Sequence, residues 1–377
     1  MNKYFFNSLK KVISKFSFYS FKLLNSNHQI SFFSSIIKGL ERSSNSYVTY
    51  YERPVIPSNL NNITIDPVNE KLAIVIQGPI KKDNHFTFET VKWYQNIFPN
   101  SRIVVSTWKD EDIKEVKLLK SLGIEVLLNN KPEISGMGNM NFQVKSTLEG
   151  IKWAEQIGCE YVIKTRTDQR IYKENLFQYL LSLQLCFPVD KIYSTLNQQE
   201  RIIMFEGNVP GNMFIPFHFC DFFYFGKLKD ILSYFSKQWD DTTNWLNNSE
   251  RGQQMRGFKE SNVSVSKAHS IAAPEVILNR NYLKNNGIST DIFSLEDSWA
   301  YAKSHLITIG WEDLGLFWYK YDKNYNESYL RNTQRNDEKT NIYKYTWSFV
   351  NWMAVYGKQL KPTEEMKNYC KKGLNDV

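Results

Sequence analysis

The chain has 377 residues, of which 42% are hydrophobic and 15% aromatic, and it carries a net charge of +8. This composition can bury a sizeable core and excludes an intrinsically disordered chain, and the length suits one large domain with additions, or two domains. The four cysteines lie far apart and form no C-x-x-C pair, so neither a disulfide framework nor a zinc site is indicated.

The positive charge is concentrated at the start of the chain. Residues 1–46 hold seven lysines and arginines against one acid, a net charge of +6, whereas all later residues together carry +2. A nearly neutral body argues against nucleic acid as a partner, because phosphate backbones require a basic stripe on the folded domain. The same segment has apolar side chains at helical spacing, namely Phe5, Phe6, Leu9, Val12, Ile13, Phe16, Tyr19 and Leu23.

A basic amphipathic helical segment of this kind suits the surface of an anionic membrane. Its lysines and serines interrupt it too often for it to span a bilayer. The alternative is a helix that docks on the protein's own body or on another protein. We expect residues 1–46 to be a membrane-surface or partner segment, and the protein to be cytoplasmic and peripheral on the inner face of the plasma membrane.

Residues 47–70 have the prolines and asparagines of a linker, and a regular alternation begins at residue 71. Buried strands are predicted at 72–76, 103–107, 124–128 and 161–164, and amphipathic helices at 86–98, 112–121 and 139–157. Continuous apolar strands that alternate with helices predict a mostly parallel sheet with helices on both faces.

The second half is less regular and is expected to complete this sheet. Helices are predicted at about 274–283 and, rich in aromatic residues, at 341–356. The predicted domain covers 71–330, with a nucleotide-sugar half at 71–185 and an acceptor half at 186–330. A C-terminal helical extension is predicted at 331–377.

Polar residues follow the predicted strands and open a helix. Gln77 and Gly78 follow the first strand, where a glycine lets a ligand approach the backbone. Ser106 and Asp110 follow the second strand. Asn141 and Gln143 open the helix at 139–157, where unpaired N–H groups suit a phosphate, although asparagines also cap helices that have no function.

The most informative block runs from Lys164 to Arg170, where a short apolar strand leads into a cluster of one acid and three bases. The carboxyl ends of strands are where α/β sheets bind ligands. If the backbone stays extended, Arg166, Asp168 and Arg170 point to one side and suit a phosphorylated ligand, with or without a metal. The alternative is a surface salt-bridge cluster.

Two acids stand out in the second half. Asp221 lies within an apolar run, where burial should raise the pKa of a carboxylate and suit it for acid–base work. Glu275 follows Pro274 at the start of a predicted helix, where the helix dipole alone explains an acid. Each is therefore either a catalytic candidate or a structural residue.

In order and spacing these blocks resemble the WavE lipopolysaccharide-synthesis family. The blocks are Ile74 to Pro79, Ile103 to Trp108, Asn141 to Gln143, Lys164 to Arg170, Asp221 to Phe223, Pro274-Glu275, and Gly315 before Trp318 and Lys320. The resemblance covers about residues 71–325. It implies a glycosyltransferase with a GT-A-like fold, in which a nucleotide-binding α/β sheet carries an Asp-x-Asp motif that binds metal and diphosphate.

The resemblance also implies roles for the residues above. Gln77, Gly78, Ser106 and Asp110 would line the nucleoside pocket, Asn141 and Gln143 would touch sugar or phosphate, Asp168 with Arg166 and Arg170 would hold the diphosphate, and Asp221 or Glu275 would be the base. Arg166 stands where the first acid of the motif would be, so Mg²⁺ or Mn²⁺ at Asp168 is an open question.

The implied reaction moves a sugar from a nucleotide-sugar donor to a lipid-linked or growing glycan in lipopolysaccharide or capsule synthesis. The alternative is a catalytically degenerate relative that acts as a binding or scaffold protein of a polysaccharide assembly complex.

Overall fold

The computed structural model describes residues 3–44, 47–48, 53–57, 71–206, 212–236, 238, 273–289, 295–322, 345–364 and 366–367. The chain divides into two compact units, residues 1–54 and 55–377, which are treated separately below.

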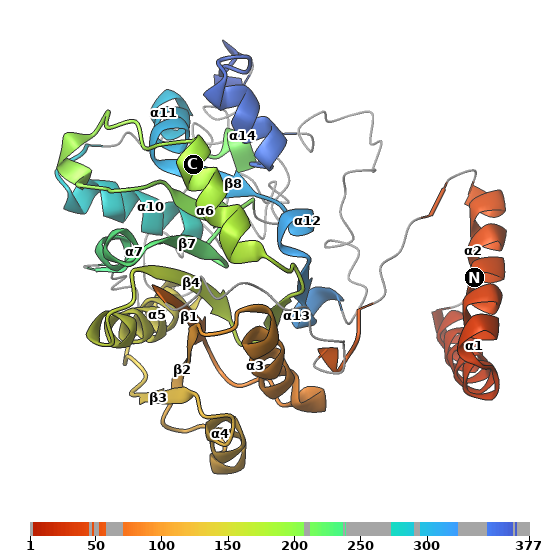
Figure 1. Cartoon of the computed structure of the whole chain (residues 1–377). Helices are drawn as coiled ribbons and strands as arrows, with labels where there is room; N and C mark the ends of the chain where they lie inside the picture. Colours follow the sequence, from red (N-terminus) through yellow and green to blue (C-terminus); the bar gives the residue numbers. More distant parts are fainter. Residues whose placement is uncertain are drawn as a thin grey trace. The chain divides into compact units, whose positions relative to one another are not determined.

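The first unit consists of two helices, α1 (Lys3–Leu23) and α2 (Ser26–Ser44) (Figure 1). The break comes at Asn25, whose side-chain oxygen accepts a hydrogen bond from the His28 N–H at 3.0 Å and so caps the second helix. Gln29 donates to the Phe21 carbonyl at 2.7 Å, and the Phe21 and Phe32 rings pack edge to face at 5.4 Å. Within the described residues, neither these nor any other helix combines the length and the apolar character needed to cross a membrane.

The second unit is built on a seven-stranded sheet in the order β3-β2-β1-β4-β7-β6-β8. The strands are β1 (Leu72–Gln77), β2 (Arg102–Trp108), β3 (Glu125–Asn129), β4 (Tyr161–Arg166), β6 (Ile202–Phe205), β7 (Tyr224–Lys227) and β8 (Leu306–Ile309). Only β7 among them runs antiparallel to its neighbours, so the sheet is mostly parallel, as predicted.

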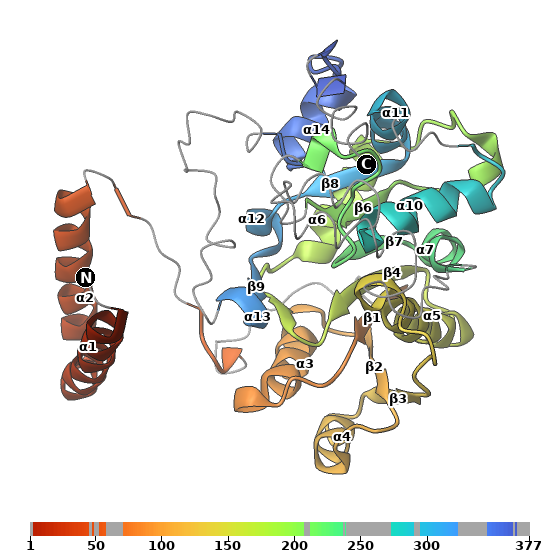
Figure 2. The same ribbon diagram turned by 180° about the vertical axis from the view of Figure 1, so that it is seen from behind.

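Helices cover both faces of the sheet, which explains why β1 is buried along its whole length. α5 (Met140–Gln156) and α7 (Leu228–Phe235) lie on one face and α3 (Phe86–Ile97) on the other (Figures 1 and 2). The other helices of this unit are α4 (Ile113–Lys120), α6 (Leu176–Cys186), α10 (Pro274–Asn285), α11 (Leu295–His305), α12 (Trp311–Leu314), α13 (Tyr319–Asp322) and α14 (Phe349–Tyr356).

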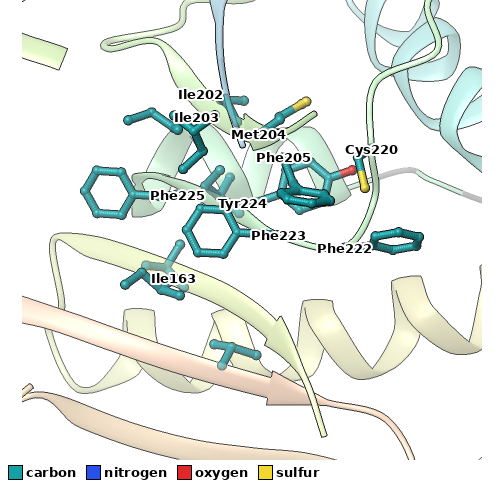
Figure 3. Close-up of a cluster of buried hydrophobic side chains, with 14 of the residues drawn as sticks. Ile163, Ile202, Ile203, Met204, Phe205, Cys220, Phe222, Phe223, Tyr224 and Phe225 are labelled. Atoms are coloured by element: carbon teal, nitrogen blue, oxygen red, sulfur yellow. The ribbon is translucent and has the colours of Figure 1, made fainter. Parts of the chain in front are cut away.

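One hydrophobic core joins the two halves of this unit. Ile163 of β4 packs in the same cluster as Ile203 of β6, Phe223 of the segment leading into β7, and Phe225 of β7, its partner in the sheet (Figure 3). The irregular second half therefore completes the sheet begun by the first.

A second, two-stranded sheet begins directly after β4. The chain turns at Thr167 and Asp168, and β5 (Gln169–Ile171) then pairs antiparallel with β9 (Leu316–Trp318). The extended backbone assumed for residues 166–170 is therefore wrong. The turn separates Arg170 from Arg166 and Asp168, and the pairing brings Trp318 beside the turn.

The aromatic helix predicted at 341–356 is shorter than expected. It begins at Phe349, because Ser348 caps it by accepting a hydrogen bond from the Asn351 N–H at 3.3 Å. Residues 345–348 are not helical, and the Trp347 N–H there donates to the Asn212 side chain at 2.9 Å. Residues 341–344 lie outside the described part of the chain.

Candidate functional site

The order of the strands singles out one edge of the sheet. From β1 the chain moves outward through β2 and β3, then returns to place β4 on the other side of β1. At such a switch point the loops after the two strands diverge and leave a crevice, which is where open α/β sheets bind ligands.

A pocket of about 550 Å³ lies at this point. The end of β1 and the loop after it supply residues 77–81, and the end of β4 and its turn supply residues 166–168. The turn before α5 adds residues 138–139 and the first turn of α5 adds residues 142–143, and the remaining lining side chains are Trp108, Lys131 and Lys320. The volume is in the range of pockets that take small molecules.

The wall after β1 requires a glycine. Gly78 has a φ of 116°, a conformation that residues with a side chain rarely adopt, and its N–H donates to the Ser106 carbonyl at 3.1 Å. A Cβ at this position would lie 3.1 Å from the Thr167 hydroxyl oxygen. That hydroxyl in turn donates to the Pro79 carbonyl at 2.6 Å, so the loops after β1 and β4 are fastened to each other.

The wall after β4 carries an ion pair. Arg166 donates from Nε to Oδ1 of Asp168 at 2.8 Å and from Nη2 to Oδ2 at 3.2 Å. The indole N–H of Trp318 donates to Oδ2 at 2.9 Å. Burial alone would raise the pKa of Asp168, but the Arg166 charge and these hydrogen bonds outweigh it and hold that pKa below its ordinary value. The carboxylate is therefore ionised at neutral pH.

The pocket is electropositive. Lys81, Lys131, Arg166 and Lys320 line it, against a single acid, Asp168. Lys131 pairs with Asp110 at 2.5 Å. Several cations around one concave site attract anions, and they bind phosphate groups with charge-assisted hydrogen bonds.

Five of the predicted site residues line the pocket together, namely Gln77, Gly78, Gln143, Arg166 and Asp168. The side-chain oxygen of Gln77 accepts a hydrogen bond from Ser146 of α5 at 2.9 Å, which ties the end of β1 to the helix.

Three other predicted donor-binding residues hold the surrounding loops or lie at the margin. Ser106 is fully buried and accepts a hydrogen bond from Asn129 at 2.9 Å. Asn141 is also fully buried and donates to the Ile134 carbonyl at 3.1 Å. Asp110 is exposed and contacts the pocket only through its partner Lys131.

Arg170 is not among the lining residues, which corrects the expectation that it points the same way as Asp168. Its side chain is 1% exposed and lies over the Phe86 ring at 4.4 Å. Its guanidinium donates to Thr90 at 2.9 Å, to the Phe86 carbonyl at 3.0 Å and to the Val55 carbonyl at 2.9 Å. The reason is the turn at residues 167–168, which redirects the backbone before β5.

The two candidate bases lie behind the pocket wall. Asp221 and Glu275 are 5% and 8% exposed, and neither lines the pocket. The Asp221 carbonyl accepts hydrogen bonds from Gln143, at 2.7 Å, and from the buried Lys164, at 2.5 Å. Burial, and then the charge of Asp221, raise the pKa of Glu275 to about 8.

Lys164 belongs to the same buried group. Its desolvation lowers its pKa to about 7, although the nearby Asp221 charge opposes that change. Buried groups with such shifted pKa values are typical of functional sites, but they also occur in structural ion-pair networks.

A divalent metal, which the GT-A resemblance implies at Asp168, does not fit these residues. Both oxygens of that carboxylate already accept hydrogen bonds, and the group beside it is a guanidinium. Within the ranges that the structure describes, no three His, Cys, Asp or Glu side chains cluster as a metal site would require.

The three lysines that line the pocket, Lys81, Lys131 and Lys320, were not among the residues predicted for the site. Lys131 follows β3 by two residues, so it is at the same carboxyl edge of the sheet as the residues that were chosen. The rule for strand ends was therefore sufficient to find it. Lys320 reaches the pocket only through the β5–β9 pairing, which no local pattern predicts.

The comparison with known proteins gives one family. The family model for WavE lipopolysaccharide synthesis matches residues 72–372, a longer stretch than the motifs alone covered. No curated protein matches the chain. Because the matched region is most of the 377 residues and contains the whole pocket, the chain belongs to the WavE family of lipopolysaccharide synthesis.

Proposed function

We propose that the chain is a glycosyltransferase that moves a sugar from a nucleotide-sugar donor to a lipid-linked or growing surface polysaccharide. The observation that carries the proposal is the electropositive pocket at the switch point between β1 and β4. A nucleoside diphosphate has the anionic charge that such a pocket attracts, and membership of a lipopolysaccharide synthesis family makes a sugar transfer the natural reaction.

In this proposal the walls have separate tasks. Gln77, Gly78 and Trp108 contact the nucleoside, because the backbone at the glycine can be approached closely and the indole offers a flat apolar surface. Arg166 and Lys320 bind the diphosphate. Ser106 and Asn141 support the loops from behind.

The acceptor hydroxyl needs a base, and we propose Glu275 or Asp221. A base works best when its pKa is close to the pH of the reaction, and burial moves the pKa of Glu275 in that direction. Both residues are buried and neither lines the pocket, and the Asp221 carbonyl is bonded to Gln143 of the pocket wall, so acceptor binding would have to move this part of the protein for either carboxylate to reach a hydroxyl.

The alternative function is a binding or scaffold protein that retains the fold without catalysis. The burial of both candidate bases and the pairing of Asp168 with Arg166 favour it. The two functions differ in turnover: both can bind a nucleotide sugar, but only the enzyme releases nucleoside diphosphate from it.

The test is calorimetry and a donor-hydrolysis and transfer assay over a panel of nucleotide sugars, with the full chain. We expect one donor to bind, and Lys320→Ala to weaken its binding about tenfold, as loss of one charge-assisted hydrogen bond would. Lys152→Ala is the matched control, because this lysine pairs with Glu149 on α5 outside the pocket. Binding of none of the donors would refute the enzyme, and binding without turnover would favour the scaffold.

We also propose that residues 1–46 attach the protein to the inner face of an anionic membrane. In α1 the exposed Val12, Phe16, Tyr19 and Leu23 recur at helical spacing beside Lys11, Lys15 and Lys22. The test is sedimentation with vesicles of anionic or of zwitterionic lipid. Salt and deletion of residues 1–46 should both release the protein from the anionic vesicles, and unchanged binding after deletion would disprove the attachment.

A further inference from the structure

Asp168, in the turn after β4, accepts hydrogen bonds from neighbouring side chains at both of its carboxylate oxygens. Asp168 holds Arg166 through two parallel N–H to oxygen contacts, at 2.8 and 3.2 Å, and Oδ2 also accepts from Trp318 at 2.9 Å. A carboxylate that binds Mg²⁺ or Mn²⁺ must turn an oxygen lone pair to the ion. Three of the roughly four lone-pair sites of this carboxylate are already taken, and an ion at the remaining one would lie close to a guanidinium of the same sign of charge.

Arg166 is held in a fixed place by these contacts. Its guanidinium carbon lies 5.3 Å from the Trp318 ring centre and 5.9 Å from that of Phe222, and the side chain is still 28% exposed. Nε and Nη2 contact Asp168, and within the described part of the chain Nη1 makes no hydrogen bond. One edge of the planar group is therefore fastened and Nη1 remains for a ligand.

We propose that the pocket binds the diphosphate of its donor without a divalent metal, through Arg166, and that Asp168 is a positioning residue for that arginine. The inference rests on the proposed function, since it concerns the diphosphate of the same donor. Arginine suits this task because its planar fork matches phosphate oxygens and its charge does not depend on pH.

The rest of the pocket supplies the charge that a metal would otherwise bring. Lys81, Lys131 and Lys320 line the same cavity as Arg166. Lys131 is paired with Asp110, and Lys81 lies over the Tyr319 ring at 4.6 Å. Lys81 is also paired, with Asp83. Against the three partner acids Asp83, Asp110 and Asp168, the four cations keep a net positive charge of one, and Asp83 and Asp110 are exposed, so their lysines can turn to a diphosphate.

The first experiment is titration calorimetry of the full chain with the common nucleoside diphosphates and with inorganic pyrophosphate, in excess EDTA and in excess Mn²⁺. We expect the affinities in the two buffers to agree within about twofold, which is less than 0.5 kcal/mol. Binding that appears only with Mn²⁺ would overturn the inference and leave the proposed function standing. Binding in neither buffer would overturn both.

The second experiment separates positioning from metal binding at Asp168. Asp168→Asn keeps the size of the side chain, and Arg166→Lys keeps the charge but loses the fork. We expect each to weaken diphosphate binding by about tenfold in EDTA and in Mn²⁺ alike. Because one residue acts through the other, the double variant should be no weaker than Arg166→Lys alone.

Melting temperatures show whether these variants remain folded. A different result would show that the carboxylate is a metal ligand and that the inference is wrong. In that case Asp168→Asn would bind diphosphate as tightly as the wild type in EDTA, and would be weaker than the wild type only in Mn²⁺. Additive losses in the double variant would show that the acid does not act through Arg166.

Discussion

Arg170 offers a direct test of how the β4 turn divides the cationic block. The turn places Arg166 in the pocket and Arg170 in the interior, where four hydrogen bonds, to Thr90, Tyr172 and the carbonyls of Phe86 and Val55, hold its guanidinium. Arg170→Met keeps an unbranched chain of similar length and removes all four.

The expected cost follows from the hydrogen bonds that are lost. Phe86 O retains a hydrogen bond from Thr90 at 2.7 Å, and Val55 is 61% exposed, so water can reach its carbonyl. A hydrogen bond to a charged group contributes about 1.5–3 kcal/mol. Because all four bonds come from one guanidinium, they are not additive, and we expect a loss of about 3 kcal/mol in the free energy of unfolding.

Urea denaturation and thermal melting measure that loss, and calorimetry measures nucleotide binding in the same samples. We expect the melting temperature to fall by at least about 5 °C and the nucleotide affinity to stay within about twofold. Lys173→Met is the control, because it removes the same charge from an exposed position nearby and should change stability by less than about 0.5 kcal/mol. A variant with wild-type stability and no nucleotide affinity would place Arg170 in the site and refute the reasoning.

Three further variants test the packing, the buried acids and the glycine turn. Gly150→Ala should raise the helix propensity of α5 by about 1 kcal/mol, but the new Cβ would clash with the Val75 side chain. Overpacking of this kind costs about 1–3 kcal/mol, so the variant should be less stable than the wild type. Its urea midpoint should fall, and a rise would contradict the close approach of α5 to β1. The raised pKa of Glu275 means that the folded state holds a proton which the unfolded state releases above about pH 4.5, so stability should decline as pH rises toward 8. Glu275→Gln should flatten that decline between pH 5 and pH 8, and an unchanged slope in urea denaturation would show that Glu275 is not its source. Gly78→Ala forces a side chain to a φ of 116° and brings its Cβ to 3.1 Å from Thr167, so both melting temperature and nucleotide affinity should drop. Full affinity in that variant would mean that the loop after β1 does not contact the nucleotide.

The sequence was most informative where each local pattern has a single structural solution. The apolar run predicted as a strand at 72–76 is β1, Leu72–Gln77, and the helix predicted at 139–157 is α5, Met140–Gln156. β1 is buried on both faces, as a continuous apolar run predicts, and α5 is buried on one face at the helix period, so local order and tertiary packing favour the same answer. The helix predicted at 341–356 was too long, because Ser348 caps its N-terminus and the helix begins only at Phe349.

Pocket-lining residues were predictable when they end or directly follow a strand, because the ends of neighbouring parallel strands meet at one edge. Gln77 and Arg166 end β1 and β4, which pair so that these two residues are opposite each other, and both line the pocket. Arg170 was predicted to point the same way as Asp168 because side chains alternate along an extended strand. The turn at residues 167–168 ends that alternation. Lys320 and Trp318 are placed at the β4 turn by the pairing of β5 with β9, two strands that lie about 150 residues apart in the sequence.

By itself, the sequence determined the alternating α/β class, the cationic block after β4 and the family, because each depends on residue types at short or fixed spacing. Only the tertiary structure decided how the side chains of the block are arranged. The pairing of β5 with β9 brings Trp318 to Asp168, and the turn sends Arg170 into the core. Asp168 resembled a metal ligand in the sequence, but in the structure its carboxylate pairs with Arg166 and accepts a hydrogen bond from Trp318. Trp318 is distant in sequence, so only folding brings it to Asp168.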